Sequence, residues 1–250
     1  MREHFINRVA RQLHRMVHPE YKRMKELAIL EYKKPASRTD IINFILQRFA
    51  RNTCYLEIGV RNPQHNFAHI KANEKYSVDP GKEFEANPVD FKVTSDEFFA
   101  QLRAGKILNH QIKFDVIFID GLHLADQVNR DIINALDFIA EDGFVVLHDC
   151  NPASEWHARE NHMFLETPAF GIWNGTTWKA FQKWRFEPGV FSCCVDCDWG
   201  VGVLSKKLNI GNNIQPVNPF FEFDVLNENK KTHLNLVTFE TFKSFFTTAS

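Results

Sequence analysis

The sequence lacks long hydrophobic runs. Its 250 residues contain no stretch of about eighteen consecutive apolar side chains, the length that a membrane-spanning helix needs. The first residues, from Met1 to His4, do not lead into the apolar segment of a signal peptide. We therefore expect a protein without a membrane span, located in the cytoplasm.

The chain also has few cysteines and almost no net charge. The five cysteines are an odd number in a chain for which no export is expected, which argues against a disulfide framework. Thirty basic and thirty-one acidic residues give a formal charge of −1, which argues against sequence-independent binding of nucleic acid. The first 51 residues are basic, and we interpret them as a solvated helical surface, with a membrane or partner contact as the alternative.

Apolar spacing predicts the fold class. Helical periodicity covers the chain before residue 52, with apolar positions from Phe5 to Phe49 and an expected cap at Thr39 or Asp40. Apolar runs then alternate with helical stretches, which is typical of βα units. The expected strands are residues 55–60, 75–78, 91–93, 114–119 and 144–147, followed by a hairpin of 190–196 and 201–205.

The helices expected after these strands include one around residues 67–71, one after a Thr94 cap, one over 125–140 and one over 176–185. We predict an α/β fold: a Rossmann-like, doubly wound, mostly parallel seven-stranded sheet with a terminal hairpin. Residues 1–51 are predicted to form a helical extension, 52–207 the main domain, and 208–250 a C-terminal extension packed on it.

Polar residues follow the predicted strands. Ligands of open parallel sheets bind beyond the carboxyl ends of the strands, so these residues are the candidates for a site. The set consists of Glu57, Gly59, Asp79, Thr94, Ser95, Asp96, Asp120, His148 and Asp149.

Gly59 and Asp79 have the spacing of a nucleoside site. A glycine after the first strand lets the backbone approach a ligand, and an acid about 20 residues later can bind ribose hydroxyls. Arg61 and Pro63 occupy positions where a dinucleotide fold carries further glycines, which disfavours a pyrophosphate and hence NAD. A cofactor with ribose and adenine but no phosphate fits better, with its adenine near residues 94–96.

Four segments, residues 55–60, 78–80, 114–123 and 143–149, together resemble the class I S-adenosylmethionine-dependent methyltransferases. The likeness spans about residues 52–205 and is nearest to a branch with I-D-G-x-H and H-D motifs, often associated with sugar or glycan modification. It implies that Glu57 and Gly59 flank the methionine part of the cofactor, that Asp79 binds the ribose, and that Ser95 or Asp96 binds the adenine. We count Asp120 among the cofactor contacts. Arg61 to Pro63 depart from the family's glycines.

The resemblance also implies a candidate site for a divalent metal. The two strands that end at Asp120 and at His148-Asp149 should be neighbours about 4.8 Å apart, and two carboxylates that close repel without a cation or proton between them. Some relatives bind a metal at the positions of Asp120, His148 and Asp149. Leu122 and His148 replace acids of those relatives, which weakens a Mg²⁺ site and leaves open a softer ion or no metal.

Histidines are the candidates for catalysis. An attacking hydroxyl must lose its proton, and an imidazole with an ordinary pKa near 6.5 can accept it, so His123 is the preferred general base. His148 is the competitor, and Asp149 completes the catalytic set. The loop of residues 150–175, with Trp156 and Trp173, is expected to cover an acceptor with an apolar face and several hydroxyls, such as a sugar.

We therefore expect S-adenosylmethionine-dependent O-methylation of a sugar or glycan-linked small molecule. The alternative is a non-catalytic S-adenosylmethionine-binding regulatory or scaffold protein. An NAD-dependent or nucleotide-sugar oxidoreductase needs a glycine turn that this chain lacks. A nucleic-acid methyltransferase would need a basic substrate face, and Asp149 to Pro152 only faintly match its usual motif. The sequence leaves the oligomeric state open.

Overall fold

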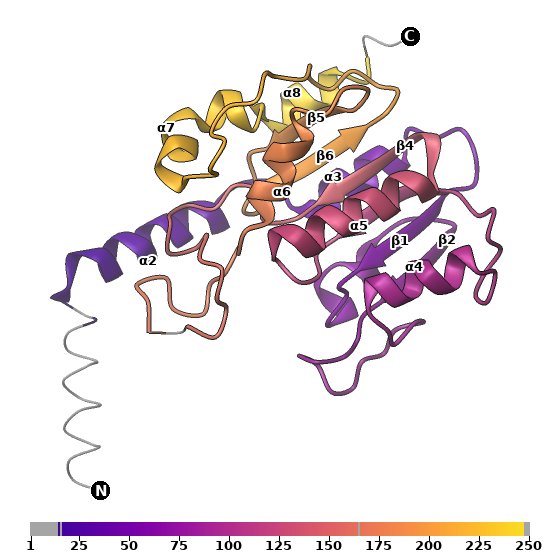
Figure 1. The fold of residues 1–250 in the computed structure, drawn as a ribbon, viewed down its shortest axis with the longest axis horizontal. Helices are drawn as coiled ribbons and strands as arrows, with labels where there is room; N and C mark the ends of the chain where they lie inside the picture. Colours follow the sequence, from indigo (N-terminus) through magenta and orange to yellow (C-terminus); the bar gives the residue numbers. More distant parts are fainter. Residues whose placement is uncertain (1–14, 16, 165, 248–250) are drawn as a thin grey trace, which may run out of the picture.

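A seven-stranded sheet forms the centre of the protein (Figure 1), as the computed structural model of residues 15, 17–164 and 166–247 shows. The strand order is β2-β1-β3-β4-β6-β5-β7, which confirms the predicted Rossmann-like fold class. The first four strands in this order are mutually parallel, β6 is antiparallel to its neighbours β4 and β5, and β7 is parallel to β5. The strands are β1 (Cys54–Ile58), β2 (Glu74–Val78), β3 (Phe114–Ile119), β4 (Ile139–Leu147), β5 (Phe191–Val195), β6 (Val201–Ser205) and β7 (Leu236–Val237).

Two hydrophobic clusters pack on opposite faces of this sheet. Side chains alternate along each strand, so Leu56 and Ile58 join one cluster while Tyr55 joins the other. The first cluster contains residues of α4 (Ser95–Arg103), α5 (Ala125–Phe138), α6 (Thr177–Trp184) and α7 (Phe223–His233). The second contains residues of α3 (Arg38–Leu46) and α8 (Phe239–Ser244). Elements from both ends of the chain thus cover one face of the sheet.

The connection between β1 and β2 differs from the prediction. The expected helix around residues 67–71 is wrong, because only two 3₁₀ turns form, η1 (Pro63–His65) and η2 (Phe67–His69). Pro63 fits the first turn of a helix but lacks a backbone N–H, and the left-handed φ of 49° at Arg61 precedes it. The sheet face beside this short connection is covered by α3 instead.

Two further predictions need correction. Residues 91–93 form no strand, since Phe91 makes a single bridge to Val78. The cap of α3 is Ser37 rather than Thr39 or Asp40, and Asp40 closes a capping box with it. The Thr94 cap of α4 and the hairpin of β5 and β6 are confirmed.

The N-terminal helix α2 (Pro19–Tyr32) projects away from the sheet in Figure 1. Of its side chains, Met24 and Ala28 are buried. The apolar positions predicted from Phe5 to Leu13 lie outside the described residues. None of the described helices combines the length and apolarity that crossing a bilayer requires.

Candidate active site

Backbone hydrogen bonds join the carboxyl ends of four neighbouring strands. The amide of Gly59 donates to Val78 at 2.8 Å, and that of Asp120 donates to Ile58 at 2.8 Å. On the far side of β3, the amide of His148 donates to Ile119 at 3.1 Å. The residues that follow β2, β1, β3 and β4 therefore form one row, as the sequence predicts for strands in parallel register.

Gly59 is tightly packed in this row. Its φ is +85°, and a β-carbon built on it would lie 2.3 Å from the carbonyl oxygen of Asp120. A side chain would therefore force the ends of β1 and β3 apart. The glycine is required by this close approach as well as by its left-handed backbone.

Asp79 is fixed by the same turns. Its Oδ2 accepts from the backbone N–H of Arg61 at 2.8 Å, and its Oδ1 accepts from that of Gly81 at 2.6 Å. Each carboxylate oxygen has a second lone pair, so an oriented acceptor remains for hydroxyl groups such as those of a ribose.

The other predicted cofactor residues lie on either side of this row. Glu57 is 2% exposed and accepts from Tyr55 Oη at 2.6 Å and from Asn66 Nδ2 at 2.8 Å. Burial raises the pKa of Glu57 to about 7, although both hydrogen bonds favour the charged form. At the start of α4, Ser95 and Asp96 both accept from Gln127 of α5, at 3.1 and 3.3 Å.

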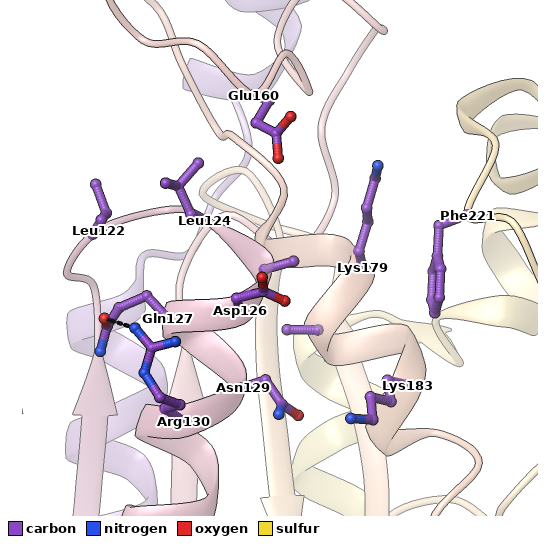
Figure 2. A pocket seen from close by; sticks show the side chains of 12 residues that line it. Leu122, Leu124, Asp126, Gln127, Asn129, Arg130, Glu160, Lys179, Lys183 and Phe221 are labelled. Carbon is purple, nitrogen blue, oxygen red and sulfur yellow. Dashed lines mark hydrogen bonds between the residues drawn. The ribbon is translucent and has the colours of Figure 1, made fainter. Parts of the chain in front are cut away.

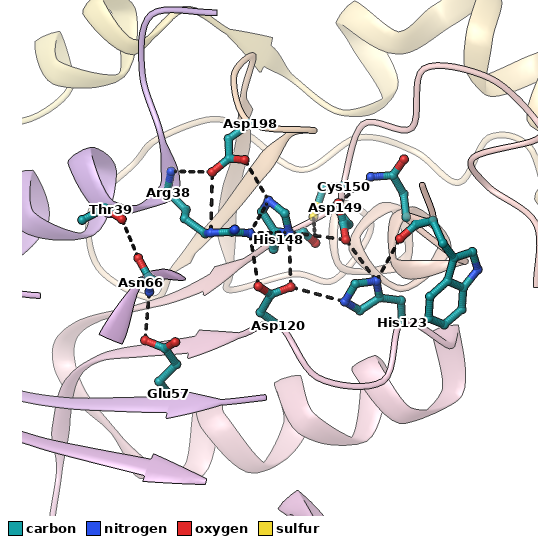
Figure 3. Close-up of polar contacts among 12 residues, drawn as sticks. Arg38, Thr39, Glu57, Asn66, Asp120, His123, His148, Asp149, Cys150 and Asp198 are labelled. Atoms are coloured by element: carbon teal, nitrogen blue, oxygen red, sulfur yellow. Dashed lines mark hydrogen bonds and ion pairs between the residues drawn. The ribbon is translucent and has the colours of Figure 1, made fainter. Parts of the chain in front are cut away.

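His123 lies between two carboxylates (Figure 3). Its Nε2 is 3.3 Å from Asp120 Oδ1, and its Nδ1 is 3.0 Å from Asp149 Oδ2. Trp173 stacks on the imidazole with ring centroids 5.0 Å apart and an interplanar angle of 18°. The structure thus brings together His123, Asp120 and Asp149, which the sequence predicted to form one site.

His148 lies on the other side of Asp120. Its Nδ1 is 3.2 Å from Asp120 Oδ1 and 3.3 Å from Asp149 Oδ2. Its Nε2 is 3.2 Å from Asp198 Oδ1, which comes from the turn between β5 and β6. That turn reaches the site because β6 runs antiparallel to β4, and Leu147 pairs with Gly202.

An arginine completes this group of charges. Arg38 Nη1 lies 3.2 Å from Asp120 Oδ2, and it is 2.9 and 2.7 Å from the two ring nitrogens of His148. Sequence reasoning missed Arg38, which is the first residue of α3 and is far from every strand end in the chain. It missed Asp198 as well, which lies between the two strands of the predicted hairpin.

The close charges control the protonation of the site. Burial alone would lower the pKa of His123, but the charges of Asp149 and Asp120 and their hydrogen bonds raise it to about 10. The same two carboxylates hold the pKa of His148 well above its ordinary value, although burial and the nearby charge of Arg38 both lower it. Burial opposes ionisation of Asp120, but the charges of His148 and Arg38 hold its pKa well below the usual range. Both histidines therefore carry a proton at neutral pH in this state.

This protonation changes the argument for His123. An imidazole with an ordinary pKa near 6.5, as expected from the sequence, would be mostly neutral at pH 7. In the structure, His123 is a cation that donates to carboxylates from both ring nitrogens. It can act as a base only after it loses a proton and one of these contacts.

The oxygen and nitrogen donors of the site are of types that bind divalent ions. Asp120, His123 and Asp149 each offer a ligand atom within 4.8 Å of the other two. The set predicted from the sequence, Asp120, His148 and Asp149, also converges at Nδ1 of His148. The guanidinium of Arg38, however, lies against two members of that set. The predicted set therefore does not fit an ion unless Arg38 moves.

The loop after β4 covers His123 and contacts Asp149. Asn174 is buried and donates a hydrogen bond from its side-chain amide to Asp149. The indole of Trp173 donates to the carbonyl of Arg159 at 2.7 Å, and its ring also contacts His162. Trp178 is buried in the core, and Trp184 packs against the same hydrophobic cluster.

A hollow of about 590 Å³ lies beside this loop (Figure 2). Leu122 and Leu124, which flank His123 in the chain, form one wall, and α5 and α6 form others. Its polar lining is mixed in charge and includes Asp126, Arg130, Glu160, Lys179 and Lys183. The hollow does not include either histidine of the site among its lining residues.

Residues 21–150 match the model of a family described as a methyltransferase domain. The fold and this match define the class of the protein as an α/β methyltransferase. The match extends over more than half of the chain, and the chain belongs to this methyltransferase family. The predicted class of S-adenosylmethionine-dependent methyltransferases is thereby confirmed, whereas the sugar acceptor and the residue roles stay predictions.

The solved structures that match this chain are distant in sequence. An O-methyltransferase from Bacillus cereus in complex with SAH has 13% identity over 79% of this chain and 97% of its own, with a TM-score of 0.39. The tomaymycin-synthesis O-methyltransferase of Streptomyces achromogenes, in complex with SAM, has 11% identity over 75% of this chain and 89% of its own, with a TM-score of 0.41. A methyltransferase of the mycinamycin biosynthetic pathway, in complex with Mg, SAH and mycinamycin VI, has 13% identity over 83% of this chain and 59% of its own, with a TM-score of 0.41. No curated protein sequence matches the chain.

Proposed function

We propose that this protein transfers the methyl group of S-adenosylmethionine to a hydroxyl oxygen of a sugar or glycan-linked small molecule. The observation that carries the proposal is the row of Gly59, Asp79, Asp120 and His148 at one edge of a methyltransferase-family sheet. The cofactor supplies a methyl group activated by a positively charged sulfur. The remaining tasks, which are alignment and removal of a proton, fall to the side chains of this edge.

The cofactor's ribose is proposed to bind Asp79, whose carboxylate is already oriented by two backbone N–H groups. Its methionine part would lie near Gly59, and its adenine near Ser95 and Asp96. The edge carries three ionised carboxylates, Asp120, Asp149 and Asp198, whose pKa values are all lowered by neighbouring cations despite burial. Arg38 and the two protonated histidines balance these charges, so the loss of one histidine proton would offset the added charge of the sulfonium.

His123 is the proposed proton acceptor. Its side chain is 19% exposed, against 8% for His148, whose ring lies beneath Arg38. A raised pKa makes neutral His123 a strong base, which suits a weakly acidic alcohol. A bound sulfonium adds positive charge at this edge and so lowers the pKa of His123 towards neutrality.

The acceptor is proposed to lie against the 150–175 loop. Trp173 presents an indole next to His123, and Trp156 is 39% exposed on the same loop. A sugar has an apolar face for such rings and hydroxyls for the polar groups beside them. An acceptor hydroxyl placed at His123 would replace one of its carboxylate contacts.

A methyl-transfer assay tests this proposal. Purified protein is incubated with S-adenosylmethionine labelled at the methyl group and with matched acceptors that differ in one group: a sugar hydroxyl, the corresponding amine and the deoxy sugar. We expect label in the hydroxyl compound alone. Transfer to the amine alone would reject O-methylation. Cofactor binding without transfer to any acceptor would favour the regulatory or scaffold alternative.

A further inference from the structure

Arg38 is held at the site by its backbone as well as its side chain. The capping box of Ser37 and Asp40 fixes the start of α3, and the backbone N–H of Arg38 donates to Asp198 Oδ2 at 2.9 Å. Its Nε lies 3.7 Å from the same oxygen. The guanidinium therefore cannot leave the site without breaking contacts to the β5–β6 turn. Its side chain is 21% exposed.

The end of this guanidinium lies beside Asp120 and His148, two side chains of types that bind metal ions. Nη1 is within 3.2 Å of an oxygen of Asp120 and within 3 Å of both nitrogens of His148. A divalent ion bound by the same two side chains would lie about 2.0–2.2 Å from each, along a nitrogen lone pair in the plane of the imidazole, and Nη1, which lies over that ring, would be directly beside it. Guanidinium and ion would also repel at such a distance.

The negative charges of the site also require a cation at this position. Asp120, Asp149 and Asp198 bring three negative charges into contact with His148. Carboxylates so close need compensating cations, and an arginine is charged at every physiological pH. Arg38 provides a permanent positive charge where some metal-dependent sites use an ion.

We propose that Arg38 is the fixed cation of this site, and that its charge beside Asp120 and His148 keeps a divalent metal from these two side chains, so that methyl transfer is metal-independent. The proposal rests on the methyl-transfer function proposed above. Arg38 is a positioning residue, since it contacts Asp120, which in turn contacts His123, and does not touch the acceptor.

A second possible metal site predicts the opposite result, that the wild type binds an ion with Arg38 in place. An ion at Asp120, His123 and Asp149 would not need the position of Arg38. It would need His123 to give up one of its two carboxylate contacts, at 3.0 and 3.3 Å, and to lose its proton. The two arrangements differ in whether removing Arg38 or removing His123 changes the binding of an ion.

Calorimetric titration with MnCl₂ and with ZnCl₂ tests the proposal on the full chain without cofactor. The variants are Arg38→Met, which removes the charge, and Arg38→Lys, which keeps it. Arg51→Met is the matched control, because Arg51 pairs with aspartates at the opposite end of the same strands. We expect no ion at the site of the wild type, Arg38→Lys or the control, and one ion in Arg38→Met, bound at least about tenfold more tightly than the weakest binding that the titration detects.

Adding Asp120→Asn to Arg38→Met should abolish the gained binding. One ion bound by the wild type and lost in His123→Gln would overturn the proposal, and so would an Arg38→Met variant that keeps its fold by circular dichroism but gains no ion. Should Arg38→Met not fold, Arg38→Lys and the wild type still decide, because an ion bound by either in an Asp120-dependent manner contradicts a fixed cation. S-adenosylhomocysteine is titrated separately: failure to bind it rejects the methyl-transfer function and leaves the metal result readable.

Discussion

The two ends of the same parallel strands carry similar charges in different settings. At the amino end, Arg51 pairs with Asp115 of β3 at 2.5 Å and with Asp142 of β4 at 2.6 Å. At the carboxyl end, Arg38 pairs with Asp120 after β3 and lies near Asp198. At the amino end Asp115 is 6% exposed but Arg51 and Asp142 are 45% and 39% exposed, whereas every charged side chain around Arg38 is at most 21% exposed.

Histidine is the second difference. The amino-end pairs hold β3 and β4 to the segment before β1, and Asp115 also accepts from the backbone N–H of Cys54. The carboxyl end adds His123 and His148, whose pKa values are raised by neighbouring carboxylates against the effect of burial. Arginine and aspartate alone make a structural tie. Burial and two imidazoles turn the same pair into a group of charges able to exchange protons.

The largest expected effect comes from His123→Gln, which keeps a polar side chain and removes the titrating group. If His123 accepts the proton, methyl transfer should fall by about 10²–10⁴-fold, while S-adenosylhomocysteine binding stays within a few-fold of the wild type. In the wild type, kcat/KM measured at cofactor concentrations below saturation reports the free enzyme, and it should rise with pH towards the His123 pKa of about 10. A rate that His123→Gln leaves unchanged would assign the proton to another group.

Gly59→Ala should have the next largest effect, on stability. Its β-carbon would meet the Asp120 carbonyl at 2.3 Å, whereas Gly189, with a similar φ of +82°, has nothing within 4 Å of that position. We expect a loss of about 3–4 kcal/mol for Gly59→Ala and about 1–2 kcal/mol for the control Gly189→Ala, which carries only the backbone strain. Urea denaturation measures both, and equal losses would show that the ends of β1 and β3 are not tightly packed.

Glu57→Gln probes the strand that joins the two ends. Burial raises the pKa of Glu57 from 4.5 to about 7, so its folded form favours the proton. The stability that this proton confers is complete below pH 4.5 and is lost as the pH rises through 7. Glutamine has no such loss, so Glu57→Gln should gain about 2–3 kcal/mol relative to the wild type between pH 5 and pH 8. Denaturation curves at the two pH values measure this, and an unchanged difference would contradict the raised pKa.

Arg51→Met should have the smallest effect. The contact of Arg51 with Asp142 is half exposed and screened by solvent, but Asp115 is 6% exposed and would keep only the backbone N–H of Cys54 as a partner. We therefore expect a loss of about 1–2 kcal/mol in stability. Methyl transfer and metal binding should not change. If Arg51→Met altered either as much as Arg38→Met, the two ends of the strands would be coupled, and the contrast drawn between them would fail.

The strand pattern and the edge of the site could be predicted from the sequence. The nearly all-apolar run of β3 identifies a strand buried on both faces, and the acids and histidines after such strands must share one edge. That reasoning placed Asp120, His123, His148 and Asp149 together. It also predicted the Thr94 cap, because a cap depends on residues three positions apart.

Contacts made across the fold could not be predicted in this way. Arg38 reaches Asp120 over a separation of 82 residues, and only the packing of α3 on the sheet brings them together. Strand β7 has two residues, too few for a periodic signal, and forms because β5 leaves an edge to pair with. The protonation of His123 likewise depends on two carboxylates whose distances no sequence pattern contains.

Binding of S-adenosylmethionine by calorimetry, in the presence of a chelator, is the most direct test of the central claim that this carboxyl edge is a methyl-transfer site. We predict one equivalent bound by the wild type, binding at least about tenfold weaker in Asp79→Asn, and unchanged binding in the exposed control Asp137→Asn. Absence of binding, or equal affinity in Asp79→Asn and the wild type, would contradict the account.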